Sequence, residues 1–417
     1  METKFSYKKI FVLGLGFGVI SLTWAIYDAY VPMILQSYLV DMPNVKYIDT
    51  TINAIMTFDN IFAISLIPFI GALSDKTWTR FGRRMPYLLV GIPIGALFFA
   101  AIPYIDFSFW ALIVVILIMN FAMALFRGPT IALMPDLTPS HLRSKANGIV
   151  NFMGGVGAIT FYGLFTKLFT ENQGNIYAAF PVTGVIMIIV LLILLVSIRE
   201  TKDQFIQSDK KSDGIFKTLI SLFKEKKTST YFLLGAIFLW FFGWHGITAN
   251  FSRYGETIWN VSEDISSGYL MFFSATLIIM SIPSGIIASK FGRKKTILTG
   301  LIGMFLMLSV AQFIGADPMP MIVILLAIGG AFWALININS FPMVADMAPA
   351  AKLGLYTGLY YFSSQLAAII SPPIFGIVMD LTSRRAMFPM AALAFACALV
   401  MMIFVRRGEA QPQTKAS

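Results

Sequence analysis

Three charged residues stand inside long apolar segments of the chain and are the first candidates for chemistry. They are Asp28, Asp59 and Arg127. A charge within a membrane span is costly, and it usually faces a polar cavity or an oppositely charged partner. A carboxylate in such a place can take up and release a proton, because an apolar surrounding favours its protonated form. A guanidinium can hold that carboxylate or the oxygen atoms of a ligand.

The depth of each charge suggests its role. At a helical rise of roughly 1.5 Å per residue, Asp59 lies near the middle of its span and is the first candidate for binding a coupling ion. Asp28 lies further out and is the second such candidate. Asp28 and Tyr27 are also candidates for ligand binding, because an aromatic ring can stack on a flat ligand face while the carboxylate accepts hydroxyl hydrogen bonds. Plainer interpretations stay open: a structural ion pair for Asp59 or Arg127, and simple contact with water for Asp28.

Neutral polar and aromatic residues in other spans add candidates for binding a hydroxyl-rich ligand. A buried Asn often forms only an interhelical hydrogen bond, and His245 has the alternative of a hydrogen-bonded core histidine, although imidazole can titrate near neutral pH. No metal-binding cluster, phosphate-binding loop or catalytic triad is recognisable, so we expect neither an enzyme nor a cofactor. These further candidates are Asn151, Trp244, His245, Asn250, Asn337, Asn339 and Gln365.

Composition places the chain in a membrane. It has 417 residues, of which 57% are hydrophobic and 12% are charged. Soluble domains are about 45–50% apolar and about 25% charged, so this chain carries too little charge to cover a soluble surface. The single cysteine, Cys397, allows no intrachain disulfide and is expected to be a small buried residue.

The apolar segments predict an all-α membrane protein with twelve spanning helices in two six-helix bundles. Runs of about 18 or more apolar residues indicate such helices. We expect an N-terminal bundle over 1–198, a polar cytoplasmic loop over 199–229, and a C-terminal bundle over 230–417. The predicted spans lie near 10–36, 50–73, 86–105, 109–135, 146–169, 177–198, 230–255, 265–288, 296–315, 320–345, 353–377 and 385–405.

The positions of the basic residues predict the orientation. If the N-terminus is cytoplasmic, the inner segments hold most of the 31 Lys and Arg residues. Cytoplasmic loops of membrane proteins carry such an excess, so both termini are expected on the cytoplasmic side of the cell membrane. The same placement explains the basic net charge without a nucleic-acid partner. The lipid bilayer is the expected surrounding.

The two halves repeat. A charged hairpin around Gly82 returns around Gly292, and the segment that ends at Asp136 returns at Asp346, each 210 residues later. A constant offset across several helices implies two similar bundles, with a ligand site between them near the middle of the membrane.

These repeated segments resemble the major facilitator superfamily. The stretch from Gly71 to Arg84 is similar to its signature Gly-x-Leu-x-Asp-x-x-Gly-Arg-Arg/Lys, and Ser289 replaces the acid in the second copy. Four extra residues at 77–80 resemble a narrower branch, the glycoside–pentoside–hexuronide cation symporters and plant-type sucrose transporters. The segment from Arg127 to Asp136 is similar to helix 4 of the sucrose-type members. The resemblance implies a monomeric secondary active transporter that works by alternating access.

Within that branch, the resemblance implies proton-coupled symport of a sugar or glycoside, sucrose-like or maltose-like. The chain departs from it at two sites. Asn120 and Ile131 stand where sucrose-type members carry Asp and Arg, and Ala63 and Ile67 stand where melibiose-type members carry two acids. The second departure favours a proton over sodium as the coupling ion. The alternatives are a proton-linked exporter of hydrophobic compounds and a non-transporting sensor with the same fold.

The resemblance also assigns the hairpins to a cytoplasmic gate. Asp75 is expected at the start of the eleventh span, where a positive helix terminus favours an anion. Arg83 or Arg84 is expected to reach Asp136. The second hairpin, in which Ser289 replaces the acid, is expected to anchor its loop mainly by its basic residues. The full set of expected gate residues is Asp75, Arg80, Gly82, Arg83, Arg84, Asp136, Arg293 and Asp346.

Overall fold

The protein is an α-helical membrane protein in the computed structural model. The structure describes residues 6–40, 42, 51–52, 55–56, 58–160, 176–200, 228–261, 263–315, 320–349 and 352–409. No β-strand is present in these ranges. Their twelve α-helices are α1 (Tyr7–Val40), α3 (Phe58–Lys76), α4 (Met85–Ala101), α5 (Phe109–Asp136), α6 (Arg143–Thr160), α7 (Ala179–Ser197), α9 (Thr228–Tyr254), α10 (Glu263–Phe291), α11 (Arg293–Ala311), α12 (Met321–Met347), α13 (Leu353–Leu381) and α14 (Met387–Phe404).

These helices confirm the all-α membrane fold. Ten of the described helices are long and apolar enough to cross a membrane. The other two, α3 and α6, lie in the predicted second and fifth spans and complete the set. Both contain charged residues: α3 has Asp59 and Asp75, and α6 begins with Arg143 and Lys145.

Internal contacts divide the chain into two units. Unit 1 comprises 1–137, 149–212 and 350–358, and unit 2 comprises 138–148, 213–349 and 359–417. Helix α6 therefore begins in unit 2 and continues in unit 1, whereas α13 begins in unit 1 and continues in unit 2. The predicted division at 1–198, 199–229 and 230–417 follows chain order and stays a prediction.

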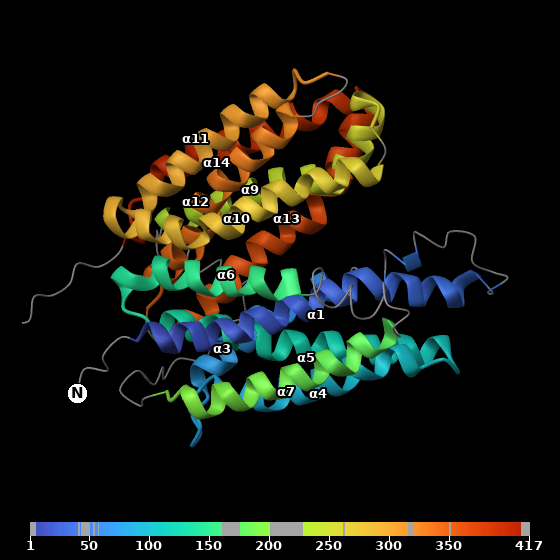
Figure 1. The fold of residues 1–417 in the computed structure, drawn as a ribbon. Coiled ribbons are helices and arrows are strands. Elements are labelled where there is room, and N and C mark those ends of the chain that lie inside the picture. The colour runs from blue at the N-terminus through green and yellow to red at the C-terminus, as the bar shows by residue number, and fades with distance from the viewer. Residues whose placement is uncertain are drawn as a thin grey trace, which may run out of the picture. The chain divides into compact units, whose positions relative to one another are not determined.

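Unit 1 is built on close helix pairs. Helix α4 packs against α5 and α7, and α3 packs against α5 (Figure 1). Glycine allows the α4–α5 approach, because a Cβ atom on Gly91 would lie 3.0 Å from the Ala122 carbonyl oxygen. Small residues at such interfaces let helix backbones approach without a hydrophobic driving force.

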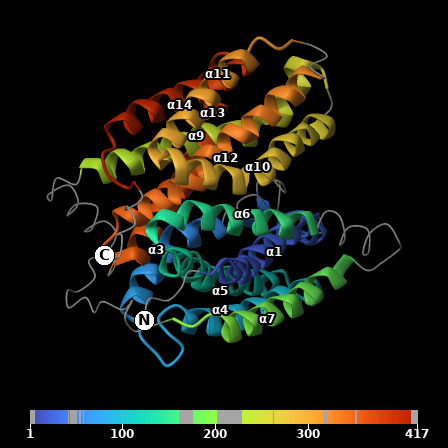
Figure 2. The ribbon, with the colours of Figure 1, turned by 60° about the vertical axis from the view of Figure 1, so that its left-hand side comes forward.

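Unit 2 repeats this arrangement. Helix α10 packs against α12, and α9 packs against α14, as Figures 1 and 2 show from two sides. A Cβ atom on Gly330 of α12 would collide with the carbonyl oxygen of Phe273 on α10. Both units therefore bring one pair of helices together at a glycine.

The surface of the helices is apolar, while polar groups lie inside. The side chains of Val196 and Phe313 are each 81% exposed, whereas Ser284 and Asn339 are fully buried. This pattern suits a surface covered by lipid. Cys397 is exposed on α14, on the same helical face as the exposed Leu393 and Val400. The prediction of a buried cysteine is therefore wrong.

Candidate functional site

The first charged junction, at the end of α3 and the start of α4, contains two arginines and two carboxylates in unit 1. The fully buried Arg84 donates through Nη2 to Asp75 Oδ1 at 2.6 Å and through Nε to Asp136 Oδ2 at 3.0 Å. Arg83 also donates to Asp136, through Nε at 3.2 Å. The expected contact with Asp136 is thus present for both arginines. The attraction between these two arginines and two carboxylates offsets part of the cost of burying them.

Asp75 also binds the first turn of α13. Its carboxylate accepts hydrogen bonds from Gly354 N at 3.0 Å and Leu355 N at 3.1 Å. These amides have no partner within their own helix, and the positive helix terminus favours the anion. The backbones meet closely here, since a Cβ atom on Gly71 would collide with the Gly354 carbonyl oxygen. The contact expected for Asp75 is present, and its role in gating stays a prediction.

An acid that sequence reasoning missed completes this junction. The Glu200 carboxylate, after the end of α7, accepts hydrogen bonds from Arg83 N and Arg84 N at 3.0 Å and from Met85 N at 3.1 Å. Glu200 therefore caps the start of α4. Burial raises the pKa of the Glu200 carboxyl, and the three backbone N–H donors partly offset that rise because they favour the charged form.

Gly82 fits against this acid in a conformation that other residues rarely adopt. Its φ is +108°, and an added Cβ would lie 2.5 Å from Glu200 Oε1. We expect Gly82→Ala to destabilise the fold by roughly 2 kcal/mol through backbone strain and a displaced cap. Thermal unfolding in detergent should show a lower midpoint. Gly315→Ala is the matched control, because a Cβ there meets nothing within 4 Å. An unchanged midpoint for Gly82→Ala would contradict the prediction.

The second junction, at the end of α10 and the start of α11, belongs to unit 2 and uses different groups. The buried Arg293 pairs with Asp346 and donates through Nε to Ser144 Oγ at 2.9 Å. Asp346 pairs with Arg143 as well and accepts from Ser140 Oγ at 2.7 Å. The second copy therefore connects the start of α6 to α11 and α12 through an acid on α12.

Ser289 does not stand in for the missing acid of that copy. Its hydroxyl donates to Gly285 O at 2.9 Å, inside its own helix. Glu409 provides the cap, accepting from Arg293 N at 2.8 Å and Lys294 N at 2.9 Å. Glu409 thus repeats the part of Glu200. The signal that could have revealed both acids is their spacing of 209 residues, close to the repeat offset.

Arg80 lies apart from the ionic cluster. It is exposed, and its guanidinium carbon lies 4.7 Å from the centre of the Phe81 ring. Arg80 forms no ion pair with any residue that the structure describes. Of the expected gate residues, the structure brings Asp75, Gly82, Arg83, Arg84 and Asp136 together in unit 1, and Arg293 and Asp346 in unit 2.

Among the candidates within the spans, unit 1 holds a buried aromatic–amide group. Tyr27 is fully buried, its hydroxyl accepts from Asn120 Nδ2 at 3.4 Å, and its ring meets the Trp24 ring edge-on at 5.3 Å. The Asn120 Oδ1 atom is buried without a hydrogen-bond partner in the described part of the chain.

Three further candidates of unit 1 differ in exposure. Asp28 is exposed, and Arg127 and Asn151 are half-buried. Asp59 belongs to α3, but its side chain is outside the described part of the structure. Its role stays a prediction.

Unit 2 brings several candidates into one cluster, which we call the aromatic–amide cluster. Trp244 stacks on Phe273, with ring centres 4.1 Å apart, and on Trp333 at 5.2 Å. Phe241 stacks on His245 at 5.9 Å and contacts Trp333 and Tyr360 edge-on. The cluster thus joins α9, α10, α12 and α13.

Tyr360 adds the polar part of this cluster. Its hydroxyl lies 3.5 Å from Asn337 Oδ1, to which it donates, and 3.2 Å from Ser340 Oγ. The cluster therefore combines flat rings with hydroxyl and amide groups. Sequence reasoning missed Phe241, Trp333 and Tyr360, because apolar and aromatic residues are common throughout such spans.

The remaining amides of unit 2 serve packing. Asn339 is fully buried and donates to Ser284 Oγ at 3.0 Å and to Leu335 O at 2.9 Å. Asn250 donates to Gly246 O of its own helix at 2.9 Å. Their contacts fit the alternative interpretation of interhelical or intrahelical bonding. Gln365 is half-buried on α13.

Comparisons with known proteins place this architecture in a family. The family model described as "MFS/sugar transport protein" matches residues 16–383. The cis,cis-muconate transport protein of Acinetobacter baylyi is 22% identical over 67% of this chain and 68% of its own length. The sucrose transport protein SUT3 of Oryza sativa subsp. japonica is 26% identical, and the match spans 38% of either chain.

A solved structure supports the same fold. The fucose:proton symporter FucP of E. coli has a TM-score of 0.78 at 14% identity, covering 96% of this chain and 99% of that chain. This likeness concerns the fold alone. Because the family model spans most of the sequence, the chain belongs to the MFS/sugar transport protein family and is a multi-pass membrane transporter, not an enzyme.

Proposed function

We propose that this transporter moves a sugar or glycoside together with a proton by alternating access. The observation that carries the proposal is the aromatic–amide cluster of unit 2. Its rings suit the apolar face of a sugar ring, and the Tyr360 hydroxyl and Asn337 amide suit sugar hydroxyls. The sucrose-transporting relative supports the same substrate class.

Coupling to a proton is assigned to a carboxylate in a span. Asp59 is the first candidate and Asp28 the second. Residues 63 and 67 of α3, both buried, are alanine and isoleucine and provide no acid for a sodium site of the melibiose type. A proton is therefore favoured over sodium.

An organic acid is the second candidate substrate. The muconate-transporting relative favours it, and Arg127 offers a guanidinium that can pair with a carboxylate. The two candidates differ in charge and hydroxyl content, so uptake experiments separate them. A proton-linked exporter of hydrophobic compounds and a non-transporting sensor would each fail to import either class.

The deciding experiment uses the full chain in proteoliposomes. Radiolabelled glycosides and dicarboxylates are offered in parallel under imposed proton or sodium gradients. We expect uptake of at least one glycoside, driven by the proton gradient and abolished when that gradient is collapsed. Uptake of dicarboxylates alone would favour the second candidate, and no gradient-driven uptake of either would overturn the transport proposal.

The cluster predicts a specific effect of Tyr360. Tyr360→Phe removes one hydrogen-bonding hydroxyl and should raise KM for the glycoside about two- to tenfold, because a hydrogen bond contributes about 0.5–1.5 kcal/mol. Tyr254→Phe is the control: it removes a buried hydroxyl of unit 2 that has no hydrogen-bond partner among the described residues. Initial uptake rates measure both variants. Equal KM values for the two would place substrate elsewhere.

We further propose that the transporter is a monomer in the cell membrane, with both termini in the cytoplasm. The excess of basic residues in the segments that would face inward supports this orientation. Accessibility of a single cysteine placed at the C-terminus, in a Cys397→Ser background, tests it in intact cells. Labelling of this cysteine by an impermeant reagent without permeabilisation would show that the C-terminus lies outside, and would contradict the proposed orientation.

A further inference from the structure

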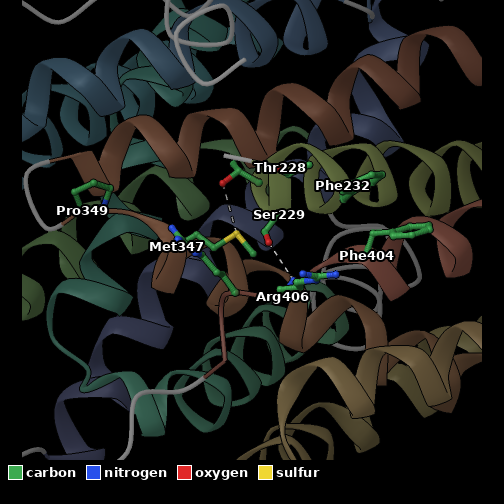
Figure 3. Close-up of a pocket in the computed structure, with 9 residues that line it drawn as sticks. Thr228, Ser229, Phe232, Met347, Pro349, Phe404 and Arg406 are labelled. Atoms are coloured by element: carbon green, nitrogen blue, oxygen red, sulfur yellow. Dashed lines mark hydrogen bonds between the residues drawn. The ribbon is translucent and has the colours of Figure 1, made fainter. Parts of the chain in front are cut away.

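A cavity lies in unit 2 where α9 begins and α14 ends, away from the aromatic–amide cluster. Its volume is about 600 Å³. Three elements line it: the first turns of α9, the end of α12, and the end of α14 with the residues after it (Figure 3). The lining residues of the described structure are Thr228, Ser229, Thr230, Phe232, Met347, Pro349, Phe404, Arg406 and Arg407.

The charge of this cavity is positive and uncompensated. Arg406 and Arg407 are exposed, and neither forms an ion pair with a described residue. No carboxylate is among the described lining residues. Among the described acids near in sequence, Asp346 pairs with Arg143 and Arg293, and Glu409 caps α11. An anion entering the cavity therefore meets two guanidinium groups, and none of the described lining residues is a competing acid.

The first described turn of α9 adds hydroxyl groups to the cavity, from Thr228, Ser229 and Thr230. The Thr230 hydroxyl contacts the sulfur atom of Met347 at 3.8 Å. Ser229 Oγ accepts from Arg406 N at 3.1 Å, and this bond holds the segment after α14 against the first turn of α9. Figure 3 shows Arg406 beside Ser229.

The other side of the cavity is apolar. The rings of Phe232 and Phe404 stack with their centres 5.1 Å apart, and Met347 and Pro349 complete this side. Phe404 is 52% exposed at the end of a spanning helix. The ligand that matches both sides carries a phosphate and an apolar chain.

The sequence strengthens the basic character of this region. In the sequence, the stretch Lys224-Glu225-Lys226-Lys227 precedes Thr228, so three lysines and one acid stand before the described part of α9. Such a cluster beside a membrane span is typical of binding to anionic lipids. A free phosphate would use the same charges but would gain nothing from the two phenylalanines.

We propose that this cavity binds an anionic phospholipid. The phosphate lies against Arg406, Arg407 and the hydroxyl-bearing residues 228–230, and an acyl chain lies along Phe232 and Phe404. Lipid bound there stabilises the junction of α9, α12 and α14. The proposal does not depend on which substrate is transported.

Native mass spectrometry of the full chain in detergent tests the site, with short-chain phosphatidylglycerol, phosphatidylcholine and inorganic phosphate as separate probes. We expect phosphatidylglycerol to bind more tightly than phosphatidylcholine. In the variant Arg406→Gln with Arg407→Gln, phosphatidylglycerol should bind about thirtyfold more weakly, since each basic residue near an anionic lipid strengthens binding by a factor of about five.

The matched control is Arg384→Gln with Arg385→Gln, which removes the same charge just before the other end of α14. Its affinity for phosphatidylglycerol should equal that of the unmodified chain. Elution volume and helicity verify that both variants fold. Equal binding of the two lipids, or equal losses in both variants, would overturn the proposal. Displacement of phosphatidylglycerol by millimolar inorganic phosphate, together with full affinity for this lipid in Phe232→Ala, would assign the cavity to a free anion in place of a phospholipid.

Discussion

Asp75→Asn is expected to release the start of α13 from the first junction and to slow transport. Asp75 is 5% exposed and joins three groups: the Arg84 guanidinium and the amides of Gly354 and Leu355. An amide side chain carries no charge and leaves Arg84 with one carboxylate, Asp136, in place of two. Removal of one partner from a buried ion pair typically costs about 3–5 kcal/mol.

Hydrogen exchange measures this release directly. In Asp75→Asn, the amides of Gly354 and Leu355 should exchange markedly faster, and substrate uptake should fall because the junction no longer closes reproducibly. Ser289→Ala is the control at the equivalent position of the second hairpin. Its hydroxyl bonds only within α10, so neither exchange nor uptake should change. Unchanged exchange at Gly354 in Asp75→Asn would contradict the proposed role of Asp75 in holding the start of α13.

Asp59→Asn is expected to separate exchange from concentrative uptake. If this carboxylate carries the coupled proton, its amide replacement can still bind substrate and exchange it across the membrane. It can no longer use a proton gradient to concentrate that substrate. The expected result is loss of accumulation by far more than tenfold, with counterflow exchange retained.

The matched variant is Asp28→Asn, which alters the other acid within a predicted span. If Asp28→Asn loses accumulation while Asp59→Asn keeps it, the coupling role moves to Asp28. If both variants still concentrate substrate, neither acid is the coupling group. Proteoliposomes with an imposed proton gradient and preloaded substrate provide both assays in one preparation.

The helices were predictable because hydropathy is a local property. Each spanning helix buries its own backbone hydrogen bonds, so a long apolar run is enough to indicate it. The contacts of Asp75 with the start of α13 and of Asp136 with the arginines were also predictable, because the hairpin resembles the family signature. These predictions needed no knowledge of side-chain packing.

The parts that could not be predicted depend on contacts between distant segments. Glu200 follows α7 in a polar stretch, and nothing nearby in sequence indicates that it binds the amides of Arg83 and Arg84. Trp333 and Tyr360 are ordinary aromatic residues of apolar helices until packing places them beside Trp244 and Asn337. Exposed Cys397 was misjudged for a similar reason: in a membrane protein, hydrophobicity does not distinguish the core from the lipid-facing side.

The acidic caps impose an order on biosynthesis. Glu200 follows its amide partner Arg83 by 117 residues, so the start of α4 stays uncapped until the ribosome has completed the first six helices. The amide of Gly354 follows Asp75 by 279 residues. The first half can therefore form its ion pairs and its cap during translation, while the contact of Asp75 with α13 forms only when the end of the chain is made.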